Sequence, residues 1–211
     1  MINVQEGKII TALGIPGSGK STTTNEIGKL LNIKTYHEPE EEEWGEAVKM
    51  RNQIGNFTSI MWFRSARVPL LYLAEEQRKQ GKTVMLDSYY DKLFHLYCNK
   101  KGIEWLFNDS DLYYEEMISI ASKDYKYLPN SDIIVFFKID ELNWSKFIKI
   151  RNRNLDNDLE FQKSFVLQQA MLDAAKHYCN ETNCKLIIHN QSFSTPKTEA
   201  QKIALKLQNI L

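Results

Sequence analysis

Apolar positions along the chain form five short runs, and longer segments with a helical spacing of apolar residues separate these runs. Short apolar strands that alternate with helices are typical of an α/β protein, because crossover helices bury both faces of a parallel sheet. The pattern predicts five strands, of which the last has the smallest apolar centre, at residues 8–14, 32–37, 83–87, 132–139 and 185–189.

Helical periodicity fills most of the chain between these strands. Gly81 is a plausible stop signal for the second helix, and Pro69 inside that helix is expected to bend or break it. No internal repeat and no Pro/Gly-rich linker interrupts the pattern, so we expect one domain over residues 1–211. The predicted helices are at residues 21–31, 59–80, 112–123, 143–153, 158–180 and 198–211.

Composition excludes several classes of protein. The 27 Lys and Arg residues balance 27 Asp and Glu, so no global basic field favours nucleic acid or an anionic membrane as a partner. No apolar run approaches the roughly 18 residues that span a bilayer. Three cysteines, without CxxC spacing or a preceding signal peptide, indicate reduced thiols and a cytoplasmic protein; they are Cys98, Cys179 and Cys184.

The stretch "GIPGSGKS" carries the strongest chemical signal, because it fits G-x-x-x-x-G-K-[ST] between a predicted strand and a predicted helix. Glycines let successive N–H groups point at phosphate oxygens, and the helix adds its positive dipole end. Lys20 is expected to reach the β- and γ-phosphates of ATP, and Ser21 to ligate Mg²⁺. The residues predicted to bind the ATP phosphates are Gly14, Pro16, Gly17, Ser18, Gly19, Lys20, Ser21 and Thr22.

Two classes of nucleotide user are disfavoured by missing motifs. A guanine switch needs N-K-x-D, whereas the nearest stretch here is "NKKG", and no "LSGGQ"-like stretch marks an ABC-type ATPase. Small kinases remain, and their acceptor site must come from the segments after the second and third strands. Ligands in open α/β sheets lie beyond the carboxyl ends of the strands.

Those segments, "YHEPEEEEWGEAVKMR" and "WFRSARVPLLYLAEEQRKQGKTVMLDSYYDKLFHLY", resemble the thymidylate kinase family, whose pattern runs REPGGTPxGExIR, ADR and GKxVxxDRYYDS. The resemblance implies a three-layer P-loop kinase fold, in which helices flank a five-stranded parallel sheet and a helical lid closes over it. It also implies ATP, Mg²⁺ and a nucleoside monophosphate acceptor. The residues in register are Glu38, Pro39, Gly45, Glu46, Arg67, Gly81, Val84, Asp87, Tyr89, Tyr90 and Asp91.

Two further stretches extend the resemblance. Glu38-Pro39 followed by Trp44 also resembles the deoxynucleoside kinases, where such a glutamate acts as base toward a sugar hydroxyl. The stretch "IRNRNLDNDLEFQKSF" resembles an arginine-bearing lid, expected at about residues 149–160. Arg151 and Arg153 would then stabilise the transferring phosphoryl group together with Lys20, although cations at a helix end also suit the dipole alone.

Departures from the thymidylate kinase pattern leave the acceptor open. Pro16 stands where an acidic residue is usual, and His37 and Ser88 replace arginines, each of which would supply charge-assisted bonds worth about 1.5–3 kcal/mol. A nucleoside monophosphate is the first expectation. The alternatives are a deoxynucleoside, a hydroxyl on a larger acceptor such as a modified base in nucleic acid, and a non-catalytic nucleotide-binding regulatory module.

Each charged candidate also has an ordinary structural interpretation. Asp87 ends a buried strand, which favours a role in binding Mg²⁺ or substrate over a helix cap. Glu38 is predicted to be the general base or a hydroxyl ligand, as an alternative to a surface acid. Arg67 is predicted to contact the acceptor, as an alternative to a structural salt bridge. The run 40–43 is more often a solvated face, but its charge would repel a phosphate.

Aromatic residues and histidines give weaker signals. Trp62, Tyr89 and Tyr90 are predicted to bind substrate by stacking on a base, and a place in the core is equally consistent with their spacing. The apolar stretch "VPLLYLA" is consistent with a homodimer interface or with core. No transition-metal site is assigned, because none of the histidines shows spacing such as H-E-x-x-H; they are His37, His95, His177 and His189.

Overall fold

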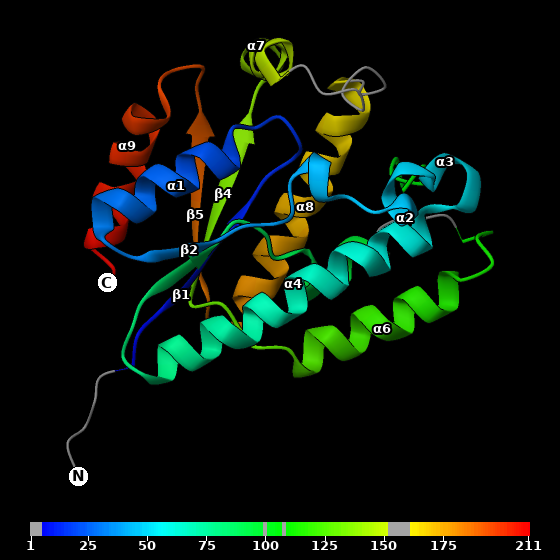
Figure 1. The fold of residues 1–211 in the computed structure, drawn as a ribbon, viewed down its shortest axis with the longest axis horizontal. Helices are drawn as coiled ribbons and strands as arrows, with labels where there is room; N and C mark the ends of the chain where they lie inside the picture. The colour runs from blue at the N-terminus through cyan, green and yellow to red at the C-terminus, as the bar shows by residue number, and fades with distance from the viewer. Residues whose placement is uncertain (1–5, 99–100, 107–108, 152–160) are drawn as a thin grey trace.

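The computed structural model describes residues 6–98, 101–106, 109–151 and 161–211. Its centre is a sheet of five parallel strands in the order β2-β3-β1-β4-β5 (Figure 1). All five predicted strands are present, and the last runs two residues past its predicted end because it pairs with β4 along its full length. The strands are β1 (Ile9–Leu13), β2 (Lys34–Tyr36), β3 (Val84–Leu86), β4 (Ile133–Ile139) and β5 (Lys185–Gln191).

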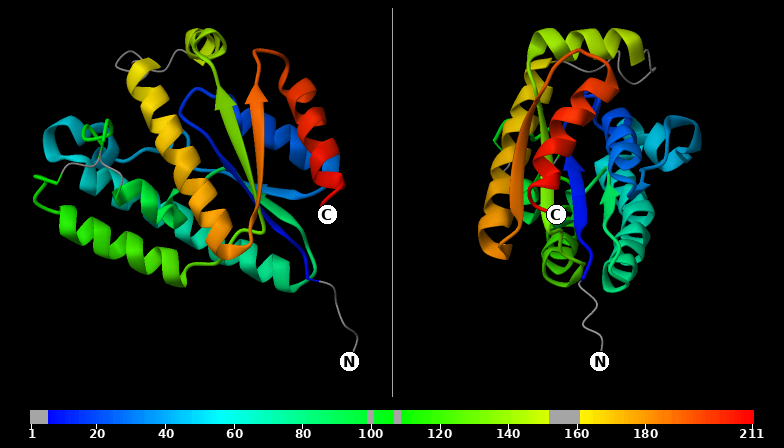
Figure 2. Two further views of the ribbon diagram at one scale, coloured as in Figure 1. Left: turned by 180° about the vertical axis from the view of Figure 1, so that it is seen from behind. Right: turned by 90° about the vertical axis from the view of Figure 1, so that its left-hand side faces the viewer.

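Two helices cover one face of the sheet, α1 (Lys20–Leu31) and α9 (Pro196–Gln208), as the two views in Figure 2 show. Because side chains alternate along a strand, Ile10 and Ala12 of β1 join this side of the core. They pack with Ile27 of α1 and Ile203 of α9. The alternate side chains of β1 therefore belong to the core on the opposite face of the sheet.

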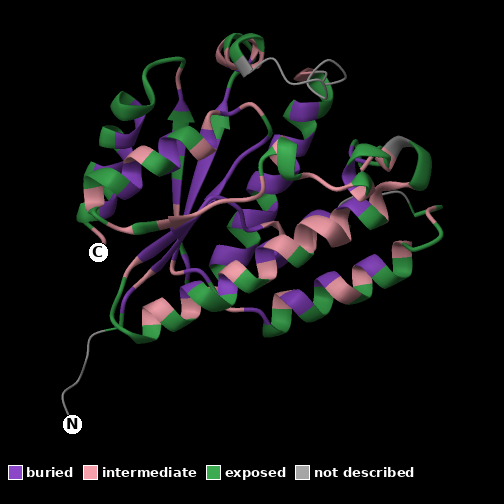
Figure 3. Cartoon of the chain, viewed as in Figure 1, coloured by how far each residue is buried: buried purple, intermediate pink, exposed green. Residues whose placement is uncertain are grey.

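The opposite face carries the larger part of the core, which includes Ile9 and Leu13 of β1. Several helices contribute to it, among them α4 (Asn56–Lys79), α5 (Phe94–Cys98), α6 (Tyr114–Tyr127) and α8 (Phe161–Thr182). In Figure 3 buried positions alternate with exposed ones along α4, α6 and α8. Trp144 adds to the same core from the helix after β4. The three layers of the predicted α/β fold are thus confirmed.

Pro69 was expected to bend or break its helix, and the structure excludes the break, because α4 continues through Pro69. Proline removes the hydrogen bond to the carbonyl four residues earlier, here that of Ser65. Both Ser65 and Pro69 lie on the exposed side of α4, where water can satisfy the freed carbonyl. The cost of the proline is therefore small enough for the helix to persist.

Several short helices were not predicted, because one turn of helix is too short to establish a periodic pattern. They are η1 (Glu41–Glu43), α2 (Glu46–Lys49), α3 (Arg51–Ile54), η2 (Tyr90–Lys92) and α5. Helix α7 (Glu141–Arg151) lies beyond the carboxyl end of β4 (Figures 1 and 2). None of the helices that the structure describes is long and apolar enough to cross a membrane.

Candidate functional site

The loop between β1 and α1 has a backbone that only glycine adopts readily. Gly17 and Gly19 have φ angles of 77° and 70°, in the left-handed region. A Cβ on Gly17 would lie 2.4 Å from Ile148 Cδ1 of α7. Helix α1 begins directly after Gly19 without a side-chain cap, so its first N–H groups and its positive dipole end remain available for an anion. These features fit the predicted phosphate loop.

Helix α7 packs directly on this loop. Trp144 Nε1 donates a hydrogen bond to the Pro16 carbonyl at 3.0 Å, and Phe147 lies against Gly19. The sequence pattern predicts a helix here, but nothing in that local pattern connects residues so far apart in the chain. The contact makes α7 a support for the phosphate loop.

Asp87, at the end of β3, is the centre of a polar cluster. His37 Nδ1 lies 3.1 Å from its Oδ2, and the Glu38 main-chain N–H donates to its Oδ1 at 3.1 Å. The Lys20 ammonium donates to the Asp87 carbonyl and lies 3.8 Å from the carboxylate. The end of β2 and the start of α1 are thereby brought to Asp87.

The electrostatic surroundings keep Asp87 ionised. Burial raises the pKa of this carboxyl group, but Lys20 and hydrogen bonds from His37 and Ser21 more than offset burial and hold the pKa well below its usual range. A buried carboxylate anion next to a Ser hydroxyl is a donor set that suits Mg²⁺. The structure thus brings Ser21 and Asp87 together, as the predicted metal site requires.

A second cluster links Glu38 to Arg67 and Asp91. Arg67 Nη1 donates to Glu38 Oε1 at 3.0 Å, while Nε and Nη2 donate to the two oxygens of Asp91 at 2.6 and 2.9 Å. Asp91 was not among the predicted site residues. A buried arginine on an apolar helix needs an acidic partner, so the sequence indicates that such a partner exists without indicating which residue it is.

The three predicted aromatic residues separate in the structure. The Tyr90 hydroxyl donates to the Gly14 carbonyl at 2.9 Å, and its ring lies 5.4 Å from the Arg67 guanidinium, so Tyr90 joins the phosphate loop to the second cluster. Trp62 is half-buried against Gly45 and Phe63. Tyr89 takes the core role instead of the predicted stacking role, because its side chain is 1% exposed and its hydroxyl donates to the Pro129 carbonyl.

A cleft of about 520 Å³ lies where these elements meet. Its wall includes Glu40 and Glu43, and Glu43 is held in place because its Oε2 accepts a hydrogen bond from the Glu40 main-chain N–H at 2.9 Å. The full lining is Ser21, Thr22, Asn25, His37, Glu38, Pro39, Glu40, Glu43, Ala66 and Leu70. Neither Lys nor Arg is among these lining residues.

A small recess adjoins the cleft, and Arg67, Asp87 and Ser88 line it. Ser88 stands where the thymidylate kinase pattern has an arginine. Its hydroxyl is buried and has no hydrogen-bond partner among the described residues. The Ser18 hydroxyl in the phosphate loop is also buried without a hydrogen-bond partner among the described residues. A bound molecule that hydrogen-bonds to these two hydroxyls would account for both.

The predicted lid cannot be placed in the same way. Arg151 ends α7, while Arg153 lies outside the described residues, as does most of the predicted lid at residues 149–160. Their roles in stabilising a transferred phosphoryl group therefore stay predictions.

No family model and no curated protein match the sequence. Among solved structures, a deoxyadenosine kinase from M. mycoides with bound dATP has a TM-score of 0.68 at 20% identity, over 95% of this chain and 99% of that one. The same kinase with products dCMP and dCDP has a TM-score of 0.66 at 20% identity, over 96% and 100%. Thymidylate kinase from Candida albicans has a TM-score of 0.57 at 17% identity, over 97% and 93%. The predicted P-loop kinase fold is therefore confirmed.

Proposed function

We propose that the protein transfers the γ-phosphate of ATP to a hydroxyl group of a deoxynucleoside. The observation that carries this proposal is the position of Glu38, whose carboxylate lines the cleft between the Asp87 cluster and Arg67. A carboxylate held at the acceptor end of a phosphate loop can accept the proton that an attacking hydroxyl must lose. The fold shared with a deoxyadenosine kinase supports the same class of reaction.

In this reaction the phosphate loop and the start of α1 bind the triphosphate, with Lys20 neutralising charge on it. Ser21 and Asp87 would hold Mg²⁺, which neutralises charge on the phosphate oxygens. The acceptor oxygen bonds to the γ-phosphorus while the bond to the bridging oxygen breaks and releases ADP. The hydroxyl proton passes to a carboxylate oxygen of Glu38, which the Arg67 hydrogen bond holds in place.

The charge of the cleft favours a nucleoside over a nucleoside monophosphate. A monophosphate needs cations, whereas the described lining holds Glu38, Glu40 and Glu43 and neither Lys nor Arg. Arg67 is not available as a free cation, because Asp91 and Glu38 already neutralise it. We therefore propose a deoxynucleoside as the acceptor, in place of the nucleoside monophosphate that was the first expectation from the sequence.

Nucleoside monophosphate transfer remains the second candidate. The in-register match to the thymidylate kinase pattern favours it, as does the fold shared with the Candida albicans enzyme. In that case Arg151 and Arg153 would hold the acceptor phosphate, and Glu38 would only position the sugar.

The two candidates can be separated by a transfer assay with radiolabelled ATP over deoxynucleosides and their monophosphates. We expect transfer to nucleosides, loss of transfer in Lys20→Ala, and a fall in kcat of about 10²- to 10⁴-fold in Glu38→Gln with ATP affinity unchanged. Glu42→Gln, an exposed residue outside the cleft lining, is the matched control and keeps its activity.

Each other outcome identifies a different function. Transfer only to monophosphates would replace the proposal with the second candidate. ATP binding without transfer to any small acceptor would favour a larger acceptor or a regulatory module. Normal ATP binding by Lys20→Ala would contradict both the assignment of this loop as the ATP site and the proposed kinase activity.

A further inference from the structure

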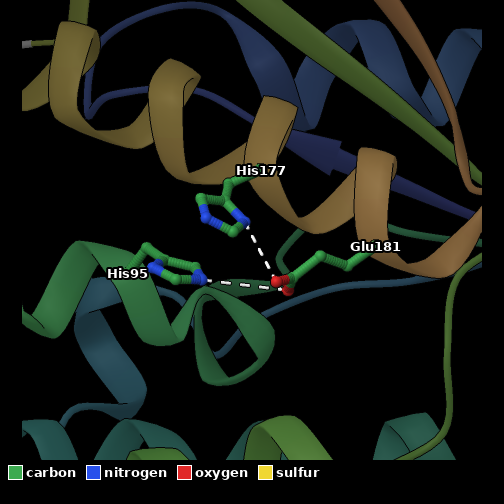
Figure 4. A group of neighbouring side chains, drawn as sticks. All are labelled: His95, His177 and Glu181. Atoms are coloured by element: carbon green, nitrogen blue, oxygen red, sulfur yellow. Dashed lines mark ion pairs between the residues drawn. The ribbon is translucent and has the colours of Figure 1, made fainter.

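A separate group of metal-binding side chains lies on helices α5 and α8. His95 comes from α5, and His177 and Glu181 come from α8; one ligand atom of each lies within 4.8 Å of the others. Figure 4 shows a ring nitrogen of each histidine directed toward the Glu181 carboxylate. Because α8 ends at Thr182, just before β5 begins at Lys185, the group lies near the amino-terminal ends of the strands. The phosphate loop lies at the opposite, carboxyl ends.

The arrangement follows from helix geometry. His177 and Glu181 are four residues apart, so they share one face of α8. Helix α5 packs against α8 and adds His95 to that face. The third ligand comes from a remote part of the chain, which explains why local spacing in the sequence indicated no metal.

The distances are close to those of a coordinated ion. His177 Nδ1 lies 3.4 Å from Glu181 Oε1, and His95 Nε2 lies 3.8 Å from Glu181 Oε2. In a tetrahedral Zn²⁺ site with bonds of about 2.0–2.1 Å, neighbouring ligand atoms are about 3.3 Å apart. Bringing the ligand atoms from within 4.8 Å of one another to this separation, and turning one of the stacked imidazoles, would let one ion contact both histidines and the carboxylate.

Charge and surroundings also suit a cation. The Tyr125 hydroxyl donates a hydrogen bond to Glu181 Oε2, the oxygen that faces His95, and so fixes the orientation of this carboxylate. The two imidazole rings stack with centroids 3.6 Å apart at an interplanar angle of 19°, an arrangement that two positive charges would oppose. Because an imidazole nitrogen binds a metal in the plane of its ring, one of the two rings must turn for both to contact one ion. Tyr125 holds the carboxylate from outside, as groups around metal ligands commonly do.

We propose that His95, His177 and Glu181 bind one Zn²⁺ ion and thereby join α5 to α8. Two imidazoles and one carboxylate are ligands that this borderline-soft ion prefers. The three side chains are 35%, 49% and 44% exposed, which leaves access for a water molecule as the fourth ligand. Helix α5 follows η2, the segment that carries Asp91, so the ion also steadies the chain behind the candidate active site.

The test uses the full chain without an affinity tag, titrated with Zn²⁺ against a chromophoric chelator. We expect one equivalent to bind and Tm to rise with free Zn²⁺, because an ion that binds only the folded chain stabilises it. Co²⁺ in place of Zn²⁺ should give the intense visible absorption of a tetrahedral site. Tyr125→Phe should weaken binding by about 10- to 100-fold. His177→Ala and Glu181→Gln should weaken it further.

Two control variants exclude other binding sites. His37→Ala removes the imidazole next to Asp87, and Cys98→Ser removes an exposed thiol on the same helix as His95; both should bind Zn²⁺ as the unaltered chain does. Circular dichroism of each variant verifies the fold. The proposal is overturned if no equivalent binds, if His177→Ala and Glu181→Gln bind normally, or if either control loses the ion.

Discussion

Arg67 and Asp91 form a doubly hydrogen-bonded ion pair in which both side chains are nearly inaccessible, at 8% and 2% exposed. Burial lowers the pKa of Arg67, but Asp91 and Glu38 outweigh burial and raise it well above its usual value. The pair joins α4 to the segment after β3 and leaves a third donor for Glu38. The position of the proposed base thus depends on one buried pair.

Asp91→Asn should lower the free energy of unfolding by about 3–5 kcal/mol, because it leaves a buried guanidinium without its main counter-charge. Urea denaturation measures the loss. Asp124→Asn is the matched control: Asp124 also accepts two hydrogen bonds from an arginine, but that residue, Arg64, is 31% exposed and stays partly hydrated. Its loss should be about 1–3 kcal/mol. A larger loss for Asp124→Asn would contradict the role of burial.

The strands and the phosphate loop could be predicted because their signals are local. A strand shows as a short apolar run, and the phosphate loop shows as glycines close together in the chain, Gly17 and Gly19 with one residue between them. Interactions between segments could not be predicted in this way. Arg67 clearly required a partner, yet only the folded chain identifies Asp91, and only the folded chain separates Tyr89 in the core from Tyr90 at the loop.

Two of the positive-φ glycines, Gly17 and Gly81, allow backbone strain to be separated from function. Their φ angles are 77° and 78°, so alanine at either position should cost about 1–2 kcal/mol in backbone strain, to which Gly17→Ala adds the close contact with Ile148 Cδ1. Only Gly17 belongs to the phosphate loop. Gly17→Ala should therefore also weaken ATP binding by about tenfold or more in a fluorescent-nucleotide titration, while Gly81→Ala binds normally. Equal affinities in the two variants would argue against the loop as the ATP site.

Glu199 should make stability depend on pH. Burial raises the pKa of this side chain, but hydrogen bonds from Lys202, Ser194, Ser192 and His189 lower it to about 2, below its ordinary value of 4.5. The carboxylate therefore contributes its full stabilisation above about pH 4.5 and loses it as pH falls toward 2. The shift corresponds to about 3 kcal/mol.

Denaturation at several pH values between about 6 and 3 measures this effect. Burial lowers the pKa of His189, so protonation of that residue removes further stability as pH falls, in the same direction. Glu199→Gln should be less stable near neutral pH and should show a flatter dependence below pH 4.5. Parallel curves for the variant and the unaltered chain would show that Glu199 is not the titrating group.

The acidic rim of the cleft should discriminate against phosphorylated acceptors. Glu40 and Glu43 line the cleft, and the capping box of η1 holds both side chains in place. Glu40→Gln and Glu43→Gln keep the hydrogen-bonding oxygen and remove the charge. Each variant should therefore bind a deoxynucleoside monophosphate about 1.5- to 5-fold more tightly, measured as inhibition of transfer to the nucleoside.

Glu42→Gln is the matched control, because it removes an equal charge from the same short helix outside the cleft lining. Inhibition of this variant by the monophosphate should not change. The gain should shrink as ionic strength rises, because salt screens the repulsion of a charged rim. An equal gain in Glu42→Gln would mean that net charge, not the position of Glu40 and Glu43 at the cleft, excludes the phosphate.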